Sequence, residues 1–540
     1  MASSPQSQTS AAMRGAAPAI SAHKWMVAIA VMLGTVLEVL DVSIINVSLP
    51  YMQGTFSASV DQIAWVLTSY LVANGIMIPM TGWISARFGR KRYFLFSVVV
   101  FVCASALCGI AQSLTEMEIF RFIQGAAGAA MVPSSQAILM ETFPPSEQQL
   151  AMATWGLGLM VAPIMGPTLG GWITYNLNWR WNFYINVPIG IAAVLMVSAF
   201  VQDPPYLKAQ RTRGEHIDYL GIALLAFGLG LMQIVLDRGQ RADWFAAEWV
   251  VIATAAAGAC LLWLPIHELR IRQPIIDMRI LGIPIFALAV LLTVGRSFVL
   301  YGTGVLLPIF LQEFMGYDAW KAGLVLAPRG LGTMAAMLLV GQLARRRIDT
   351  RGMLALGFAL MAYSLWQMAG WDSQVSMWAV IWPGILLGFG MGLTFPVVSA
   401  VSISCVERER MGYAASLYNM MRNTGAAVGI ACLTSMLISH EQLHQSRLVN
   451  HVTVFKAWQL GAIGPRLPGA PDFMYLPQIV SGHKPGLAQM MDSIQSHAAM
   501  LSFNDIYRLL ALVSALMIPS FYFFYERHAH DGATAAAHEG

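Results

Sequence analysis

Charge is scarce in this sequence. Asp, Glu, Lys and Arg together make up 11% of the 540 residues, whereas 57% are hydrophobic and the mean hydropathy is +0.60. A soluble protein of this size needs far more charge on its surface, so the composition excludes a soluble globular protein. The net charge is only +4, and nothing in the sequence favours binding to nucleic acid.

Cysteine is scarce as well. The five cysteines lie within or at the ends of apolar segments, with no paired spacing and no Cys-x-x-Cys. We therefore expect small apolar packing residues, with no disulfide and no metal site. The apolar segments also lack His or Cys pairs for a redox centre, and no nucleotide-binding loop is present. A subunit of an energy-transducing enzyme stays open as an alternative, but we expect neither catalysis nor a cofactor.

Apolar runs of about twenty residues, long enough to cross a bilayer, recur from end to end. They predict an all-α polytopic membrane protein. The first apolar run is too long and too acidic for a cleaved signal peptide. Length and helix breakers predict fourteen spans, at 25–49, 62–81, 93–112, 117–140, 150–174, 183–202, 218–236, 247–266, 285–312, 321–343, 352–370, 378–402, 413–438 and 503–525.

Lys and Arg collect in alternate loops, which predicts that those loops and both termini are cytoplasmic. The spans group as 6 + 2 + 6 because Gly82–Lys91, after the second span, has a weak repeat at Gly341–Arg347, after the tenth. The predicted organisation is a cytoplasmic tail at 1–24, a six-helix half at 25–202, a linker with two inserted helices at 203–284, a second six-helix half at 285–525, and a cytoplasmic tail at 526–540.

One predicted external loop, at 440–502, is much longer than the others. A periplasmic loop of about sixty residues is typical of an element that docks a partner or covers a cavity. The alternative is a flexible insertion. Its histidines, among them His444 and His451, look scattered without ligand spacing, so the sequence does not favour a metal site there.

Two carboxylates, Glu38 and Asp41, lie inside the first predicted span. A charge at this depth costs roughly 2.5–3.5 kcal/mol, so such residues usually handle protons or cations. Helical spacing places them on one face with Ile45 and Ser48, which can turn toward a bundle interior. Being three residues apart, the two carboxylates are expected to titrate as a coupled pair.

Arg121, in the fourth predicted span, is the best candidate for a cation that competes with the proton on Asp41, because a guanidinium stays charged. The alternative is a static ion pair between Arg121 and Asp41 with no proton traffic. Glu38 has two further interpretations: it tunes Asp41, or it contacts cationic substrates.

Three more arginines lie at apparent membrane depth, where a cation normally faces a cavity or a partner. Arg296 and Arg329 are expected to accommodate anionic or weakly acidic compounds. Arg422 is interpreted as architectural. This many arginines beside two carboxylates argues against a pocket specialised for lipophilic cations.

The loop Gly82–Lys91 resembles the signature Gly-x-Leu-x-Asp-Arg-x-Gly-Arg-Lys of the major facilitator superfamily, with Ala86 in place of Asp. Ala162–Gly171 is similar to that family's antiporter motif, in which glycines allow close helix approach and prolines allow bending. A simple packing face is the alternative. The resemblance assigns gating or conformational roles to Gly82, Arg87, Gly89, Arg90, Pro163, Gly166, Pro167, Gly170, Gly171 and Arg422.

Four further segments resemble the fourteen-span drug:proton antiporter family (EmrB/QacA type), and its EmrB-type branch in particular: Leu40–Pro50, Arg121–Gly128, Trp179–Gly190 and Leu236–Gly239. The resemblance implies two pseudo-symmetric six-helix halves plus two inserted helices. It also implies proton coupling through Asp41, Arg121 and Glu38. The predicted substrate-cavity residues are Glu38, Asn46, Arg296 and Arg329.

The implied function is export of amphipathic toxic compounds across the bacterial inner membrane, driven by the proton motive force without a cofactor. The resemblance further implies a tripartite pump with an EmrA-like periplasmic adaptor and a TolC-like outer-membrane channel. Export of one metabolite, siderophore or fatty acid is an alternative that these motifs do not separate from multidrug efflux. An ion channel is disfavoured by the antiporter-like glycines.

Overall fold

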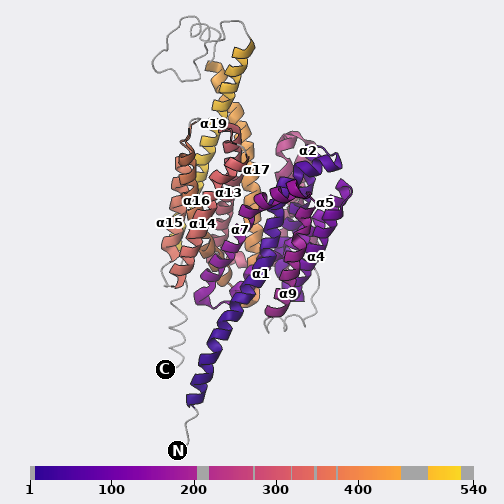
Figure 1. Cartoon of the computed structure of the whole chain (residues 1–540), viewed down its shortest axis with the longest axis vertical. Helices are drawn as coiled ribbons and strands as arrows, with labels where there is room; N and C mark the ends of the chain where they lie inside the picture. Colours follow the sequence, from indigo (N-terminus) through magenta and orange to yellow (C-terminus); the bar gives the residue numbers. More distant parts are fainter. Residues whose placement is uncertain are drawn as a thin grey trace, which may run out of the picture.

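The computed structural model describes residues 6–203, 218–271, 274–317, 319–345, 350–372, 375–451 and 484–523. These residues form a bundle of long helices, and no strand occurs among them (Figure 1). The predicted all-α fold class is therefore confirmed for the described ranges. The predicted tail at 526–540 lies outside the described residues, and so do 204–217 and 272–273 of the linker predicted at 203–284.

The first half of the bundle comprises the helices up to residue 200. α1 packs against α7 and α9, α3 packs against α5, and α5 continues into α6 after a break at Ala129 and Ala130. The bounds are α1 Gln6–Phe56, α2 Val60–Ile63, α3 Trp65–Phe88, α4 Arg90–Ile110, α5 Leu114–Gly128, α6 Met131–Thr142, α7 Gln148–Asn176, α8 Trp181–Tyr184 and α9 Asn186–Phe200.

The second half packs α14 against α16, α13 against α17, and α15 against α16 and α19. Its bounds are α13 Pro284–Ile309, α14 Ala319–Arg345, α15 Thr350–Met368, α16 Met377–Ser404, α17 Met411–His451, α19 Lys484–Leu516 and α20 Ser520–Phe523, with a π-helical turn at Phe310–Phe314. Between the halves in sequence, α11 (Tyr219–Arg238) and α12 (Glu248–Arg270) pair with each other, and α11 also touches α3 and α17.

The halves meet through reciprocal helix pairs. α3 of the first half packs on α17 of the second, and α14 of the second packs on α7 of the first. If α5 and α6 are counted as one helix, α3 is the second long helix of its half and α7 is the fifth. In the second half, α14 is the second long helix and α17 is the fifth. The contacts therefore follow a pseudo-two-fold arrangement, the pattern that inverted or paired repeats produce in transporters.

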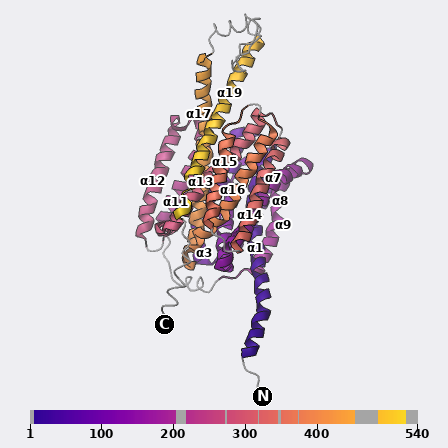
Figure 2. The same cartoon turned by 90° about the vertical axis from the view of Figure 1, so that its left-hand side faces the viewer.

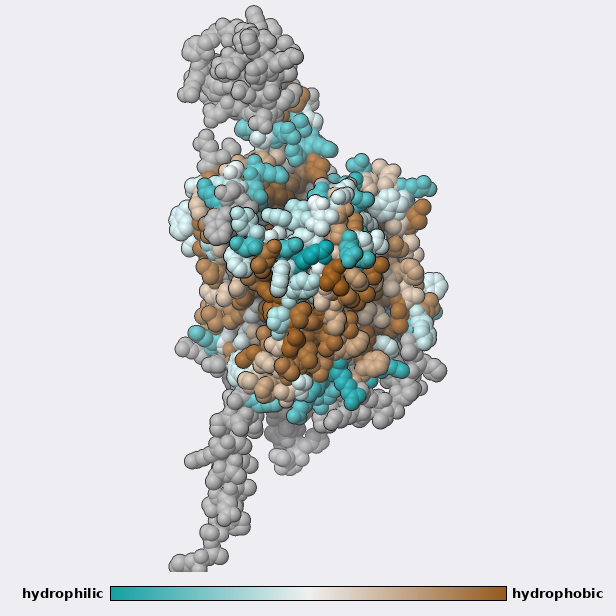
Figure 3. All heavy atoms as spheres, turned by 45° about the vertical axis from the view of Figure 1, so that its right-hand side comes forward, coloured by the Kyte–Doolittle hydropathy of each residue, from teal (hydrophilic) through white to brown (hydrophobic). Residues whose placement is uncertain are grey.

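The surface carries the apolar band that a bilayer requires. Figure 3 shows hydrophobic side chains gathered over the middle of one face, with hydrophilic ones toward both ends. Ten helices among the described residues are long and apolar enough to cross a membrane. The count of fourteen spans stays a prediction.

The long predicted loop at 440–502 needs correction. α17 continues to His451 and α19 already begins at Lys484, so both helices run past the predicted membrane boundary and project together from the bundle (Figures 1 and 2). Hydropathy misplaced the ends of the two helices, because a helix that leaves the membrane becomes polar without ending. His440–His451 contains no Pro or Gly to stop it. Residues 452–483 lie outside the described residues.

Two further expectations change with these helices. α1 begins at Gln6, so most of the predicted tail at 1–24 is helical. The interpretation of the loop histidines as scattered was wrong, because it overlooked His440. His440 and His444 stand four residues apart on α17 and share one face.

The turn between α3 and α4 depends on Gly89, whose φ of 92° and ψ of 140° are barely accessible to other residues. We expect Gly89→Ala to lower the unfolding free energy by about 1–3 kcal/mol, because the new methyl group forces strain into this turn. The matched control is Gly75→Ala within α3, where an added methyl group meets nothing within 4 Å. Thermal unfolding of detergent-purified variants measures both; equal melting temperatures would contradict the expectation.

Candidate functional site

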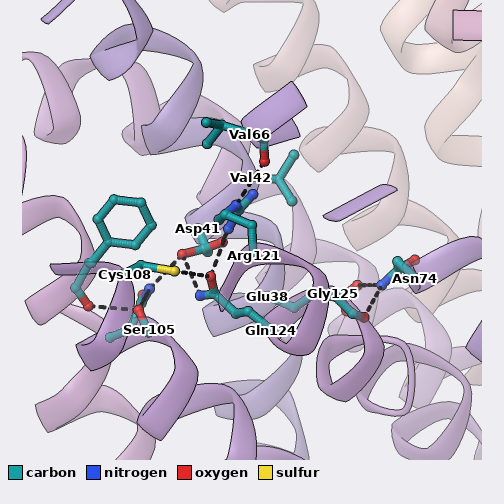
Figure 4. Close-up of polar contacts among 12 residues, drawn as sticks. Glu38, Asp41, Val42, Val66, Asn74, Ser105, Cys108, Arg121, Gln124 and Gly125 are labelled. Atoms are coloured by element: carbon teal, nitrogen blue, oxygen red, sulfur yellow. Dashed lines mark hydrogen bonds and ion pairs between the residues drawn. The ribbon is translucent and has the colours of Figure 1, made fainter. Parts of the chain in front are cut away.

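Asp41 of α1 forms a fully buried ion pair with Arg121 of α5 (Figure 4). Arg121 Nη1 lies 2.7 Å from Asp41 Oδ2. The other carboxylate oxygen, Oδ1, accepts hydrogen bonds from Gln124 Nε2 at 3.0 Å and from Asn186 Nδ2 of α9 at 2.7 Å. Three donors from two helices thus hold Asp41 by charge-assisted hydrogen bonds.

Arg121 is itself held from several sides. Its Nε donates to the Val66 carbonyl of α3 at 3.2 Å, and its guanidinium lies 4.2 Å from the centre of the Tyr70 ring. Gly125, one helical turn further along α5, makes this possible: a Cβ there would collide with the Tyr70 backbone. The Arg-x-x-x-Gly spacing therefore combines a buried cation with the close helix approach that encloses it.

Glu38 is less completely bound. Asn74 Nδ2 of α3 donates to its Oε1 at 3.1 Å, but its buried Oε2 has no hydrogen-bond partner. The stripe of Glu38, Asp41, Ile45 and Ser48 is buried, as its spacing predicts. The face therefore carries one carboxylate that is fully bonded and one with an oxygen free to receive a proton.

The end of the molecule that bears the Gly82–Lys91 loop is closed between the halves. A Cβ on Gly82 of α3 would lie 2.7 Å from the Tyr413 Cα of α17, so these two backbones touch. Gln136 of α6 lies within hydrogen-bond distance of Ser399 of α16 at 3.3 Å and of Asn419 of α17 at 2.6 Å. All three side chains are buried.

The basic loop residues at this end are bound within the protein. Buried Arg90 pairs with Glu141 at the end of α6, and the Arg87 guanidinium lies 5.8 Å from the Trp83 ring centre. Ala86 stands where the family motif has Asp. Carboxylates from elsewhere contact this loop instead: Glu141 pairs with Arg90, and Asp203 Oδ1 accepts a hydrogen bond from Lys91 N at 2.8 Å.

The glycine face of α7 packs on α1. A Cβ on Gly166 would collide with Ser43, and one on Gly170 would come 2.9 Å from Ile44 Cγ2. Gly171 is looser, with Val47 at 3.8 Å, and Pro167 lies on the same helix. The predicted close approach is therefore present. A gating role for these residues stays a prediction.

A cavity of about 210 Å³ opens between α7 of the first half and the helices of the second half. Arginines supply its charges, and no carboxylate of the described residues lines it. Its lining residues are Leu159, Met160, Pro163, Arg296, Leu300, Tyr301, Leu326, Arg329, Gly330, Thr333, Met337, Met391, Phe395 and Arg422.

The three cavity arginines have few partners of opposite charge. Arg329 Nη2 donates to Thr303 Oγ1 at 2.9 Å, and Arg296 lies 4.9 Å from the Phe395 ring centre with its Nε unpaired. Arg422 interacts electrostatically with Glu38, and its Nε also lacks a hydrogen-bond partner. The predicted placement of Arg296 and Arg329 at a cavity therefore agrees with the structure, which adds Arg422.

Two predicted cavity residues lie elsewhere. Asn46 is exposed and donates to Val42 O of its own helix at 3.1 Å, and Glu38 sits among the first-half helices. Neither lines the cavity, because the cavity lies mainly within the second half whereas both residues belong to α1. Whether a residue lines the cavity depends on how its helix packs against the others. Helical spacing shows only which residues of one helix share a face.

Sequence reasoning overlooked Gln124, Asn186 and Asn74, which bond the two carboxylates. A signal was available, since each is an amide within or beside an apolar run, and Gln124 and Asn186 fall inside motifs already singled out. Polar residues there need partners, so carboxylates on neighbouring spans were the natural candidates.

Comparisons with known proteins agree with this architecture. Residues 31–430 match the Major Facilitator Superfamily model. The chain is 36% identical over 440 residues to the multidrug export protein EmrB of Escherichia coli (strain K12), covering 81% of this chain and 85% of that protein. It is 34% identical over 427 residues to the fatty acid resistance protein FarB of Neisseria gonorrhoeae, covering 79% and 83%.

Among solved structures, the proton:xylose symporter XylE superposes with a TM-score of 0.58 at 15% identity, covering 92% of this chain and 96% of that one. At that identity the likeness shows the fold alone. The expected major facilitator fold is thereby confirmed.

The buried ion pair generates a stability prediction. Asp41→Asn and Arg121→Gln should each lower the unfolding free energy by about 3–5 kcal/mol, because each leaves an uncompensated buried charge or an unsatisfied carboxylate. The double variant should lose much less than the sum. Glu147→Gln is the control, since it disrupts the more exposed Lys24 pair, worth about 0–1 kcal/mol. Denaturation of the four variants measures this; additive losses would contradict the pairing.

Proposed function

The chain belongs to the major facilitator superfamily as an EmrB-type efflux permease, and we propose that it exports amphipathic toxic compounds in exchange for protons. The observation that carries the proposal is the buried Asp41–Arg121 pair with Glu38 on the same helix face. A carboxylate balanced by a permanent cation at this depth changes the local charge by one unit when it takes a proton.

In this mechanism a proton reaches Asp41 and neutralises it, so Arg121 loses its counter-ion and the helices around it rearrange. Glu38 accepts a proton at lower cost, because its Oε2 has no partner to displace. It serves as the second member of the coupled pair. Each net charge moved inward gains about 2.3 kcal/mol per 100 mV of membrane potential.

The conformational state follows from which end is closed. The contact between Gly82 and Tyr413 seals the end that carries the basic loops, and the positive-inside rule assigns this end to the cytoplasm. The arrangement is then the outward-facing one, in which periplasmic protons load the carboxylates. Rocking of the halves about the α3–α17 and α7–α14 contacts then opens the cytoplasmic side.

The cavity supports amphipathic acids as a substrate class. Three arginines supply its charge, and its remaining walls are mostly apolar, with three methionines that adapt to varied shapes. Arg296 and Arg329 have no carboxylate partner among the described residues, and cations in such a setting favour an anionic ligand. Because one relative is named a fatty acid resistance protein, export of fatty acids or of one endogenous acid is the second candidate function.

The setting proposed for this activity is the inner membrane of a Gram-negative bacterium, with both termini in the cytoplasm. An EmrA-like adaptor and a TolC-like channel would continue the path outward. Support comes from the resemblance to EmrB and from α17 and α19, which project from the bundle at the end opposite the basic loops (Figure 2).

Proton coupling is tested in proteoliposomes that hold an interior pH dye, with a substrate gradient imposed across the membrane. The intact protein should show substrate-dependent proton flux. Asp41→Asn should reduce it to background, and Glu38→Gln should reduce it strongly, because each removes one member of the coupled pair. Glu248→Gln, at the exposed start of α12, is the control and should match the intact protein.

Coupling that survives unchanged in Asp41→Asn would make the Asp41–Arg121 pair purely structural and move the proton site to Glu38. Substrate movement by the intact protein without any proton flux would overturn the antiport proposal. Current without substrate coupling would indicate a channel.

Substrate class is tested with Arg329→Gln. We expect its KM for a medium-chain fatty acid to rise about tenfold or more, because one charge-assisted hydrogen bond contributes about 1.5–3 kcal/mol. Its KM for a lipophilic cation such as ethidium should stay unchanged. Lys321→Gln, an exposed cation at the start of the same helix, is the control. Equal effects on acid and cation would refute an anion-selective role.

A further inference from the structure

Two histidines and an aspartate meet where α17 and α19 leave the bundle. His440 and His444 stand one helical turn apart on α17, and Asp505 faces them from α19. His440 Nδ1 lies 3.3 Å and His444 Nε2 lies 2.9 Å from the same oxygen, Asp505 Oδ2. The proton pathway and the cavity described above use none of these residues.

We propose that these three side chains bind a divalent transition-metal ion of the Zn²⁺ class. Zn²⁺ binds imidazole nitrogen and carboxylate oxygen at about 2.0–2.2 Å in tetrahedral sites, which places ligand atoms roughly 3.3 Å apart. The three ligand atoms here all lie within 4.8 Å of one another. A small inward shift of the side chains therefore brings them onto one ion.

The donor set selects the class of metal. Two imidazoles suit Zn²⁺, Cu²⁺ and Ni²⁺, whereas Ca²⁺ and Mg²⁺ prefer oxygen ligands. All three side chains are partly exposed, between 16% and 33%, so water completes the coordination and an ion can enter from solvent.

The carboxylate is oriented for this task. Arg508, one turn along α19, lies 3.2 Å from Asp505 Oδ1, the oxygen that does not face the histidines. This contact directs Oδ2 toward α17. A group that fixes a ligating carboxylate from outside is a common feature of metal sites and raises their affinity.

The predicted spans place the site at the outer membrane boundary, because His440 follows the span that ends at residue 438 and Asp505 falls at the start of the span 503–525. An ion here would join the two helices below the point where they project. The metal therefore cross-links α17 and α19 and fixes the angle between them. This angle determines where the projecting parts of the two helices lie.

The direct test is metal titration of the full chain in detergent, with any affinity tag removed. Co²⁺, a spectroscopic stand-in for Zn²⁺, should bind at one equivalent with visible absorption bands, and Zn²⁺ should displace it. His440→Ala and Asp505→Asn should each weaken binding by at least about tenfold. His267→Ala is the control, because His267 pairs with Asp218 and belongs to no group of three possible metal ligands among the described residues.

A hydrogen-bonded cluster without metal is the rival explanation, and His444→Gln separates the two. Gln keeps a donor toward Asp505 but is a poor metal ligand. If the site binds metal, the His444→Gln protein should stay folded, as measured by gel filtration and circular dichroism, but should lose metal binding. No saturable binding by the intact chain, or binding that survives all three variants, would overturn the proposal.

Discussion

A permanent cation buried among apolar helices organises the first half of this protein. Arg121 cannot lose its proton, so its position must supply a counter-charge and hydrogen-bond acceptors wherever the helices move. Asp41 supplies the charge, Val66 supplies an acceptor, and Tyr70 supplies a π-face. Because these partners come from α1 and α3 while Asn186 of α9 also holds Asp41, a change of charge at this point affects the packing of four helices together.

The second constraint is how closely helices approach across the interface between the halves. α17 touches α3 near Gly412, presents Arg422 to the cavity, and carries His440 and His444 beyond the predicted membrane boundary. One continuous helix therefore runs from the closed end, past the cavity, to the projecting segment. Because a helix moves largely as a rigid body, a rotation of α17 would change the contact with α3, the cavity and the projecting segment together.

Much of the site was predictable because its signals are local. The spacing of Glu38 and Asp41 places both on one buried face, and their cost in lipid marks them as functional. Arg121 is the matching cation, in the fourth predicted span. The prediction of a long loop from residue 440 failed because α17 continues as a polar helix through His440–His451. Hydropathy detects apolar segments and does not detect a polar helix.

The sequence by itself determined the helical membrane architecture, the buried stripe on α1 and the presence of unbalanced arginines in apolar spans, because hydrophobicity, helical period and the cost of buried charge act within one segment. Only the tertiary structure decided that Asn186 binds Asp41, that Asn46 lies outside the cavity and that Asp505 faces His440 and His444. Those contacts join residues about 60 to 145 positions apart, and their geometry depends on how rigid helices pack against one another, which local pattern does not encode.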